Sequence, residues 1–320
     1  MLVTYILFVL GFILLIKGAD LLVDGSSAIA RRFHISPLVI GLTIVAFGTS
    51  APELVVNLFA SFQGNTEIAI GNILGSNIAN ILLILGLAAF IYPLSVQKST
   101  VWKEIPFSLL AALVLGFLTH DMLIDGAGFS TLTRIDGLVL LSFFAIFLYY
   151  ITTIARSSIT AADDEPTKEI PTGKAIGFVV FGLVGLVVGG KWIVDGAIDI
   201  AQMLGISQSL IALTIVAVGT SLPELATSVI AARKKQTDIA IGNVVGSNIF
   251  NIFFILGTSA LIRPLPFQAS SDLDIAMTIG TSAILFALLF VGKRHVIERW
   301  QGLLMIALYA LYIVLLVVRS

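Results

Sequence analysis

The sequence has little charge and no cysteine, and both deficits narrow the class of protein. Charged residues make up only 12% of the 320 residues and hydrophobic ones 58%, whereas about a quarter of a soluble domain is charged. These proportions exclude an ordinary soluble protein, a disordered chain and a nucleic-acid-binding protein with a basic face. The absence of cysteine excludes a disulfide scaffold and thiolate metal sites. The three histidines are far apart and predict no ligand cluster.

Long apolar runs fill the chain and predict an all-α polytopic membrane protein. A membrane span needs about 20 apolar residues, so this length accommodates about ten transmembrane helices and little else. The first run lacks the basic start and the small-residue cleavage site of a signal peptide, so we expect a retained span. The expected spans are residues 3–28, 37–61, 68–92, 105–119, 137–154, 175–198, 208–231, 239–262, 274–292 and 302–318.

The distribution of Lys and Arg predicts the orientation of the chain. With both termini outside, 13 of the 18 Lys and Arg residues fall in inner loops, three fall outside, and Lys17 and Lys191 fall within spans. Inner loops of membrane proteins are enriched in these residues. We therefore expect a multi-pass protein of the cell (plasma or inner) membrane with both termini outside.

The sequence also contains an internal repeat. A shift of 171 positions aligns residues 24–94 with 195–265 without a gap. Five spans separate equivalent points, and because five is odd, the two copies must cross the bilayer in opposite directions. The sequence thus predicts two inverted-topology five-helix halves, with the following bounds: residues 1–154 with a repeat at about 37–92, a cytoplasmic linker at 155–174, and residues 175–320 with a repeat at about 208–263.

Each copy places one glutamate near the middle of a span, Glu53 in the second and Glu224 in the seventh. An ionised acid at this depth costs about 2.5–3.5 kcal/mol, and its recurrence in the same polar heptad favours a functional role over a protonated or interfacial one. Pro52 breaks the helix and is expected to leave the carbonyls of residues 46–49 without partners. Ser50 with Glu53 resembles a capping box that opens a new half-helix. Carbonyls, hydroxyls and one carboxylate are thus expected within one turn.

A second motif follows in spans three and eight. Gly71 and Gly75 have the G-x-x-x-G spacing that favours close helix packing. Ser76 and Asn80, four residues apart, lie on one helix face. The two motifs together supply only oxygen ligands, which suit hard cations such as Ca²⁺ and Na⁺ better than Zn²⁺ or Cu⁺.

These motifs resemble those of the sodium/calcium exchangers of the calcium/cation antiporter superfamily. The similarity rests on residues 48–53 with 75–80 and on residues 219–224 with 246–251, and it extends over nearly the whole chain. The resemblance implies exchange of Na⁺ for Ca²⁺ across the bilayer by alternating access, with no cofactor and no protein partner. By position, it implies Ca²⁺ ligands at Thr49, Glu53, Thr220 and Glu224, the threonines through their carbonyls. It implies two Na⁺ sites that flank the Ca²⁺ position, one with Ala46, Ser50 and Ser76 and the other with Ala217, Ser221 and Ser247. Thr49, Thr220 and, for each site, the glutamate of the opposite half are further implied Na⁺ ligands. Asn80 and Asn251 are implied to line the central cavity between the two sites.

One position departs from part of that family. Some prokaryotic members and the potassium-dependent branch resemble this chain but carry Asp where Asn251 stands. Without a third acid, we expect potassium-independent exchange of three Na⁺ for one Ca²⁺, which moves net charge. The proton/calcium branch typically has Gly-Asn-x-x-Glu at the first motif, so H⁺/Ca²⁺ exchange is the main alternative. A passive cation channel and a membrane-embedded Mg²⁺-dependent enzyme are remoter alternatives.

Spans one and six carry further charges whose role the sequence leaves open. Lys17 and Asp20, three residues apart, can neutralise each other on one helix face. Such charges either pair or reach the interface, or they line the sliding surface of a gating helix pair. The remaining members of the set are Asp24, Lys191, Asp195 and Asp199.

Overall fold

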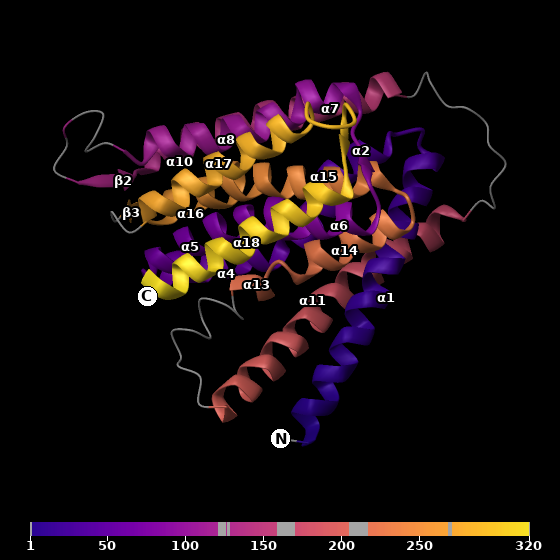
Figure 1. Ribbon diagram of the computed structural model, residues 1–320, viewed down its shortest axis with the longest axis horizontal. Helices are drawn as coiled ribbons and strands as arrows, with labels where there is room; N and C mark the ends of the chain where they lie inside the picture. Colours follow the sequence, from indigo (N-terminus) through magenta and orange to yellow (C-terminus); the bar gives the residue numbers. More distant parts are fainter. Residues whose placement is uncertain are drawn as a thin grey trace.

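The computed structural model is built almost entirely of helices (Figure 1), and it describes residues 2–120, 126, 129–158, 170–204, 217–267 and 271–319. In these ranges seven helices are long and apolar enough to cross a membrane, or eight if the pair Pro37–Thr49 and Ala51–Gln63, bent by 47°, is counted as one span. The expected span 274–292 corresponds to a helix of 17 residues. The first part of the expected span 208–231 lies outside the described residues. The membrane-helical class is confirmed, while the count of ten helices stays a prediction.

The first half of the chain contains these elements in order: α1 (Leu2–Arg32), α2 (Pro37–Ile40), η1 (Gly41–Val45), α3 (Ala46–Thr49), α4 (Ala51–Gln63), α5 (Thr66–Ala79), η2 (Asn80–Leu85), α6 (Gly86–Ile91), β1 (Leu94–Ser95), α7 (Lys98–Trp102), α8 (Glu104–Leu118), β2 (Ser130–Leu132) and α10 (Arg134–Ser158). The η elements are π-helical turns.

The second half contains α11 (Thr172–Met203), α13 (Ala217–Gly219), α14 (Leu222–Arg233), α15 (Thr237–Ile249), η4 (Phe250–Leu256), α16 (Gly257–Ile262), β3 (Leu265–Phe267), α17 (Asp272–Leu288), β4 (Val296–Ile297) and α18 (Arg299–Arg319). Most of the expected linker, residues 159–169, lies outside the described residues, and so does its acidic stretch 163–165.

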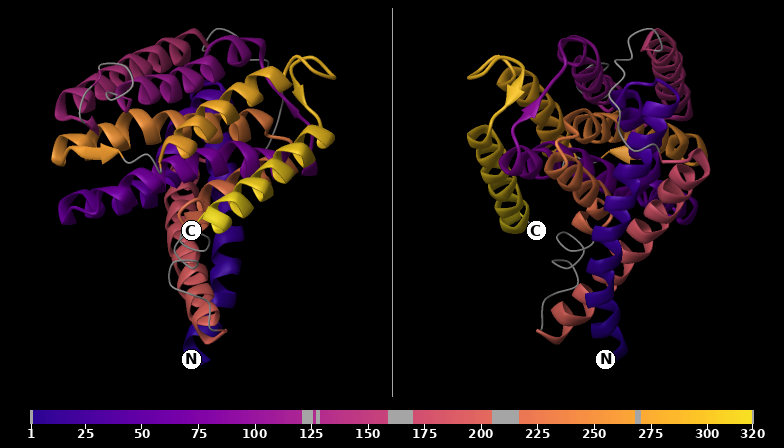
Figure 2. Two further views of the ribbon diagram at one scale, coloured as in Figure 1. Left: turned by 60° about the vertical axis from the view of Figure 1, so that its left-hand side comes forward. Right: turned by 90° about the vertical axis from the view of Figure 1, so that its right-hand side faces the viewer.

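The helices α1 and α11 form a long pair that leans away from the other helices (Figures 1 and 2). Glycines at the contact let the two backbones approach closely: a Cβ atom on Gly18 would lie 2.8 Å from the carbonyl oxygen of Gly182. At the equivalent position of α11, a Cβ atom on Gly189 would lie 2.7 Å from the carbonyl oxygen of Gly11. Glycine is required where helices touch through their backbones.

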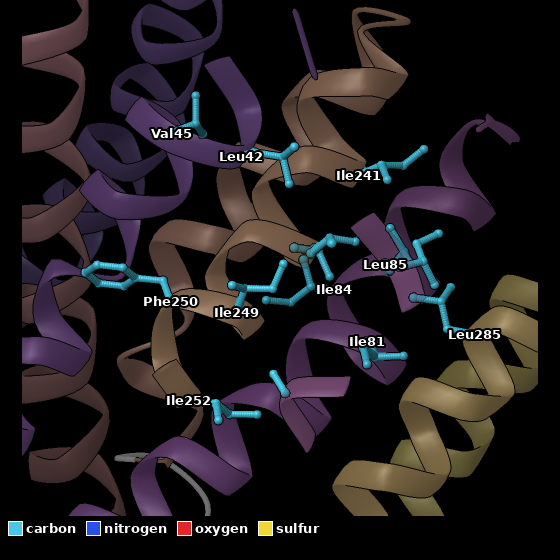
Figure 3. Packing of buried hydrophobic residues seen from close by; sticks show 14 of the residues in the cluster. Leu42, Val45, Ile81, Ile84, Leu85, Ile241, Ile249, Phe250, Ile252 and Leu285 are labelled. Atoms are coloured by element: carbon cyan, nitrogen blue, oxygen red, sulfur yellow. The ribbon is translucent and has the colours of Figure 1, made fainter. Parts of the chain in front are cut away.

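The centre of the bundle consists of two continuous helical rods, α5-η2-α6 and α15-η4-α16. They are the most buried of the long apolar helices in the described ranges, with 78% and 94% of their spanning windows buried. Figure 3 shows apolar side chains from η1, η2, α15, η4 and α17 packed in this interior. Apart from one acid in the first turn of each rod, Glu67 and Asp238, the rods carry no charge, as expected for a helix surrounded by protein on all faces.

The halves are also joined at two edges by short antiparallel strand pairs. Strand β1 pairs with β4, with Leu94 opposite Ile297, and β2 pairs with β3, with Thr131 opposite Pro266. Each pair takes one strand from each half, so backbone hydrogen bonds link the halves at both places.

The turns after α4 and α14 are built alike from different residues. Gly64 directly follows α4, and its φ of 83° is the left-handed conformation that glycine adopts without strain. The equivalent residue after α14 is Lys235, with φ 60°. The backbone turn is thus kept in both copies even where the glycine is replaced.

Candidate functional site

The first expected site element is the break between α3 and α4. The backbone N–H of Ser50 donates to the carbonyl of Ala46 (3.0 Å), so the expectation that this carbonyl lacks a partner is wrong. The Ser50 side chain makes no capping bond within its own helix, so the capping-box reading is also wrong. Pro52 does stand in the first turn of α4, where its missing N–H removes no helical bond. The break therefore frees the Ser50 hydroxyl for contacts elsewhere.

Both predicted glutamates are buried beside the break of the opposite half. Glu53 and Glu224 are each only 1% exposed. The Ser50 hydroxyl donates to Glu224 Oε1 at 2.8 Å, and the Ser221 hydroxyl donates to Glu53 Oε1 at 3.2 Å. Each acid thus accepts its shortest side-chain hydrogen bond from the half to which it does not belong.

The serines group differently from the expected flanking sets. The hydroxyl oxygens of Ser50 and Ser247 lie 2.9 Å apart, and Ser247 donates to Glu224 Oε1 (3.5 Å). Ser76, which the resemblance placed with Ser50, instead donates to Glu53 Oε1 (3.5 Å). The reason is that the α3–α4 break contacts α15 of the other half.

Four buried oxygen atoms at the site accept no hydrogen bond from the described residues. They are the second carboxylate oxygens and the two amide oxygens of the expected central cavity: Glu53 Oε2, Glu224 Oε2, Asn80 Oδ1 and Asn251 Oδ1. A buried acceptor without a partner costs about 1–3 kcal/mol, and a bound cation would offset this cost. Two carboxylates and two amides fit a hard cation.

Asn77 and Asn248 lie within the repeated motifs but are not among the predicted site residues, and they join the two central rods together with Asn80 and Asn251. The side-chain amide of Asn77 donates to the backbone carbonyl of Asn248, and Asn248 donates in turn to the carbonyl of Asn77, both at 3.3 Å. Asn80 donates to Asn248 Oδ1 and Asn251 donates to Asn77 Oδ1, both at 2.9 Å. These bonds occupy the nitrogens of Asn80 and Asn251 and leave their oxygens unpaired. Polar residues repeated inside apolar spans are the sequence signal that identifies them.

A second asparagine pair supports the acid-bearing helices. Asn72 Nδ2 donates to the backbone carbonyl of Glu53 (3.4 Å), and Asn72 Oδ1 accepts from the hydroxyl of Thr220 (3.3 Å). Asn243 Nδ2 likewise donates to the backbone carbonyl of Glu224 (3.3 Å), and Asn243 Oδ1 accepts from the hydroxyl of Thr49 (3.0 Å). The predicted Thr ligands therefore use their hydroxyls for positioning, which agrees with a role for their carbonyls.

The expected helix-packing role of the G-x-x-x-G glycines is confirmed in the second copy. A Cβ atom on Gly242 or Gly246 would lie 2.9 or 2.8 Å from the backbone of α2 or η1. For Gly71 and Gly75 no described atom lies within 4 Å of such a Cβ, and the equivalent partners fall in residues 205–216, outside the described ranges. In the first copy the packing role stays a prediction. Ala217, the expected Na⁺ ligand, begins α13 directly after that range.

The chemistry of the site depends on neutral oxygens as well as acids. Within the described residues no three His, Cys, Asp or Glu side chains gather as a metal centre. Hydroxyls and amides supply the remaining contacts, and all are hard donors that favour Na⁺ and Ca²⁺ over softer metals.

Comparison with known proteins agrees with this chemistry. Residues 3–153 and 174–318 match the family described as sodium/calcium exchanger protein. The chain is 37% identical to inner membrane protein YrbG of Escherichia coli, over 99% of this chain and 97% of that protein. It is 33% identical to the sodium/calcium exchanger MaX1 of Methanosarcina acetivorans, over 98% of each. A solved structure of the sodium-calcium exchanger NCX_Mj, soaked with Na⁺ and Sr²⁺, has a TM-score of 0.83 at 38% identity and covers 97% of each chain.

Proposed function

The chain belongs to the sodium/calcium exchanger protein family, and we propose that it exchanges Na⁺ for Ca²⁺ across a cell membrane by alternating access. One observation carries the proposal: four buried oxygens, two from carboxylates and two from amides, come from equivalent positions of both halves and accept no hydrogen bond from the described residues. Such a set is an energetic cost unless a cation completes it.

In this proposal Ca²⁺ binds between Glu53 and Glu224, with further oxygens from Asn80 and Asn251 and from the Thr49 and Thr220 carbonyls. Ca²⁺ takes six to eight oxygen ligands, and two ionised carboxylates balance its charge. The serine hydroxyls provide flanking Na⁺ positions, with the carbonyls of Ala46 and Ala217. The hydrogen bonds favour Ser50 with Ser247 at Glu224, and Ser76 with Ser221 at Glu53, as the two flanking groups.

We propose a ratio of three Na⁺ to one Ca²⁺ without K⁺. One Na⁺ in each flanking group and one at the centre give the Na⁺-loaded site a net charge of +1, because Asn80 and Asn251 supply no third acid. The Ca²⁺-loaded site is neutral. Moving one charge through the membrane potential is worth roughly 2.3 kcal/mol per 100 mV, so voltage drives the exchange.

The test is ⁴⁵Ca²⁺ uptake into proteoliposomes under an outward gradient of Na⁺, K⁺ or H⁺, applied one at a time. We expect uptake with Na⁺ only, and a reversal point that shifts with the voltage set by valinomycin and K⁺. Uptake driven by the H⁺ gradient would favour the H⁺/Ca²⁺ alternative. A Na⁺-driven reversal point that ignores voltage would mean two Na⁺ per Ca²⁺.

The inverted arrangement of the halves, with both termini outside, has a separate test. Cysteines replace Gln63, the last residue of α4, and Lys235, which stands two residues after the equivalent helix α14, in this cysteine-free chain. We expect an impermeant thiol reagent to label the Gln63→Cys protein from outside and the Lys235→Cys protein from inside. Labelling of both from the same side would contradict the inverted topology.

A further inference from the structure

Three charged side chains link α1 to the end of α14, on the face that the sequence predicts to be cytoplasmic. Lys234 Nζ lies 2.8 Å from Asp20 Oδ1 and 2.7 Å from Asp24 Oδ1, and it donates to the Asp20 carbonyl at 3.2 Å. The sequence offered Lys17 as the partner of Asp20, but the structure brings Lys234 from the other half. Lys234 directly follows α14, which carries Glu224 in its first turn. The cluster therefore ties α1 to a helix of the proposed cation site.

The repeat has no counterpart of this cluster. Shifted by 171 positions, Asp20 corresponds to Lys191, Asp24 to Asp195, and Lys234 to Gln63. Lys191 Nζ pairs with Asp195 Oδ2 at 2.7 Å inside α11 itself. Gln63 is uncharged and Asp195 is already paired within α11, so Gln63 cannot form the equivalent ion pair between the end of α4 and α11.

The two sides of the site also differ in access. A cavity of about 370 Å³ lies between α4, α11 and α14, and its described lining includes Lys191, Asp195 and Thr220. Lys191 and Asp195 are 69% and 50% exposed at this cavity. Because Asp20 and Asp24 beside α1 are also 42% and 48% exposed, the difference between the sides rests on the residues nearer the acids.

The equivalent positions beside α1 are closed. Thr49 and Thr227 are fully buried there, whereas their equivalents, Thr220 and Val56, line the cavity beside α11. The molecule is thus open beside α11 and closed beside α1, and the ion cluster of Lys234 stands on the closed side.

We propose that Lys234, with Asp20 and Asp24, forms a one-sided lock that keeps the α1 side closed and biases the protein toward the state open beside α11. The inference rests on the proposed alternating access, in which inverted halves exchange their conformations. A contact that is made in one of two states and not in the other stabilises the first state and raises its population. Since Gln63 cannot replace Lys234, the reverse state has no equivalent contact.

The experiment measures the accessibility of one cysteine on each side in the otherwise cysteine-free protein. Val56→Cys reports on the open cavity, and Thr227→Cys reports on its closed equivalent. In each of these two cysteine variants, Lys234→Met is compared with Lys235→Met. Lys235→Met serves as the control because the Lys235 ammonium lies 6.0 Å from the centre of the Tyr92 ring and outside the cluster. N-ethylmaleimide labelling is timed in detergent.

We expect Lys234→Met to raise the labelling rate at Thr227→Cys about three- to tenfold and to lower the rate at Val56→Cys, since two partly exposed ion pairs each contribute modestly. Lys235→Met leaves both rates unchanged. A charge swap, Lys234→Asp with Asp24→Lys, restores the original rates. The pair Val55→Cys and Ala226→Cys repeats the measurement at neighbouring equivalent positions in case either first reporter fails to fold.

Unchanged rates in Lys234→Met, or the same change in Lys235→Met, would overturn the lock. Na⁺-driven ⁴⁵Ca²⁺ uptake by the unsubstituted protein is measured in parallel. Absence of that uptake refutes the proposed function, whereas uptake with unchanged labelling refutes only the lock.

Discussion

The two halves of the molecule make matching asparagine contacts at the centre and diverge at the ends of α1 and α11. At the centre, Asn77 and Asn248 donate to each other's backbone carbonyls at the same distance of 3.3 Å. At the ends, Asp20 is bound by a lysine from the other half, while its equivalent, Lys191, is paired within its own helix. In our proposals, the repeated residues form the cation site, and the residues that differ between the repeats determine which side of it is closed.

This difference has a physical basis. A cation between two inverted halves must be held in both states of the transport cycle, so the ligands must be acceptable when the halves exchange roles. Contacts at the ends carry no such requirement, because each is made in one state and broken in the other. Residues that differ there change the relative populations of the states without changing the ligands.

The largest effect is expected from the two acids, which test the equivalence of the halves at the centre. Glu53→Gln and Glu224→Gln keep the shape of each side chain and remove its charge. Each is expected to lower Na⁺-driven ⁴⁵Ca²⁺ uptake at least about 100-fold, since an uncompensated charge in a buried site costs on the order of 3–5 kcal/mol. Membrane insertion and detergent-extracted monodispersity of each variant serve as controls for folding. Near-normal uptake by either variant would contradict the site.

Much of the centre could be predicted from the sequence, because its signals are local. Glu53 and Asn80 stand out as polar residues in apolar spans, and their recurrence 171 positions later marks both as parts of one site. The helix break at Pro52 follows from its missing N–H, and the structure bends there by 47°.

The remaining features depend on contacts between distant parts of the chain. The grouping of Ser50 with Ser247 joins residues 197 positions apart, and the contact of Lys234 with Asp24 joins residues 210 positions apart. Helical spacing specifies which side chains share a face of one helix, but not which helix that face will meet. Helical spacing suggested Lys17 for Asp20, and the family resemblance placed Ser76 with Ser50; in both cases the suggested partner lies in the same half.

An intermediate effect is expected at the glycines of α1 and α11. These glycines test whether the two helices pack equally closely at both of their equivalent contacts. A Cβ atom on Gly18 or on its equivalent Gly189 would meet backbone atoms at 2.8 and 2.7 Å, and backbone cannot move aside as a side chain can. Overpacking of this kind costs about 1–3 kcal/mol. Gly18→Ala and Gly189→Ala should each lower both the thermal midpoint and the exchange rate, the latter about tenfold.

The matched control for these two variants is Gly177→Ala, also in α11, where no described atom lies within 4 Å of the added Cβ. Its thermal midpoint and rate should stay close to those of the unsubstituted protein. If only one of the two contact glycines proves sensitive, the helix pair is not equivalent along its length, and the packing argument fails for the tolerant one.

The smallest effect is expected from the serines beside the acids, where the two flanking groups are similar but not identical. Ser50 is held by two short contacts, 2.8 Å to Glu224 and 2.9 Å to Ser247. The described contact of Ser221 with Glu53 is longer, at 3.2 Å. A hydroxyl that already lies close to both an acid and a second hydroxyl needs less rearrangement to bind Na⁺, so the group around Ser50 is better organised in advance.

Removing the better organised ligand should cost more. Ser50→Ala is expected to raise the Na⁺ concentration for half-maximal exchange about three- to tenfold and Ser221→Ala about twofold, since one hydrogen-bonding group is worth about 0.5–1.5 kcal/mol. The measurement is ⁴⁵Ca²⁺ flux over a range of Na⁺ concentrations at fixed voltage, with Ser142→Ala as control because that hydroxyl bonds only within its own helix in the described structure. Because the substitutions are chemically identical, the ratio of the two shifts reports the difference between the groups and not the chemistry of the change. Equal shifts would mean that the two groups bind Na⁺ alike, and that the difference between the halves is confined to the ends of α1 and α11.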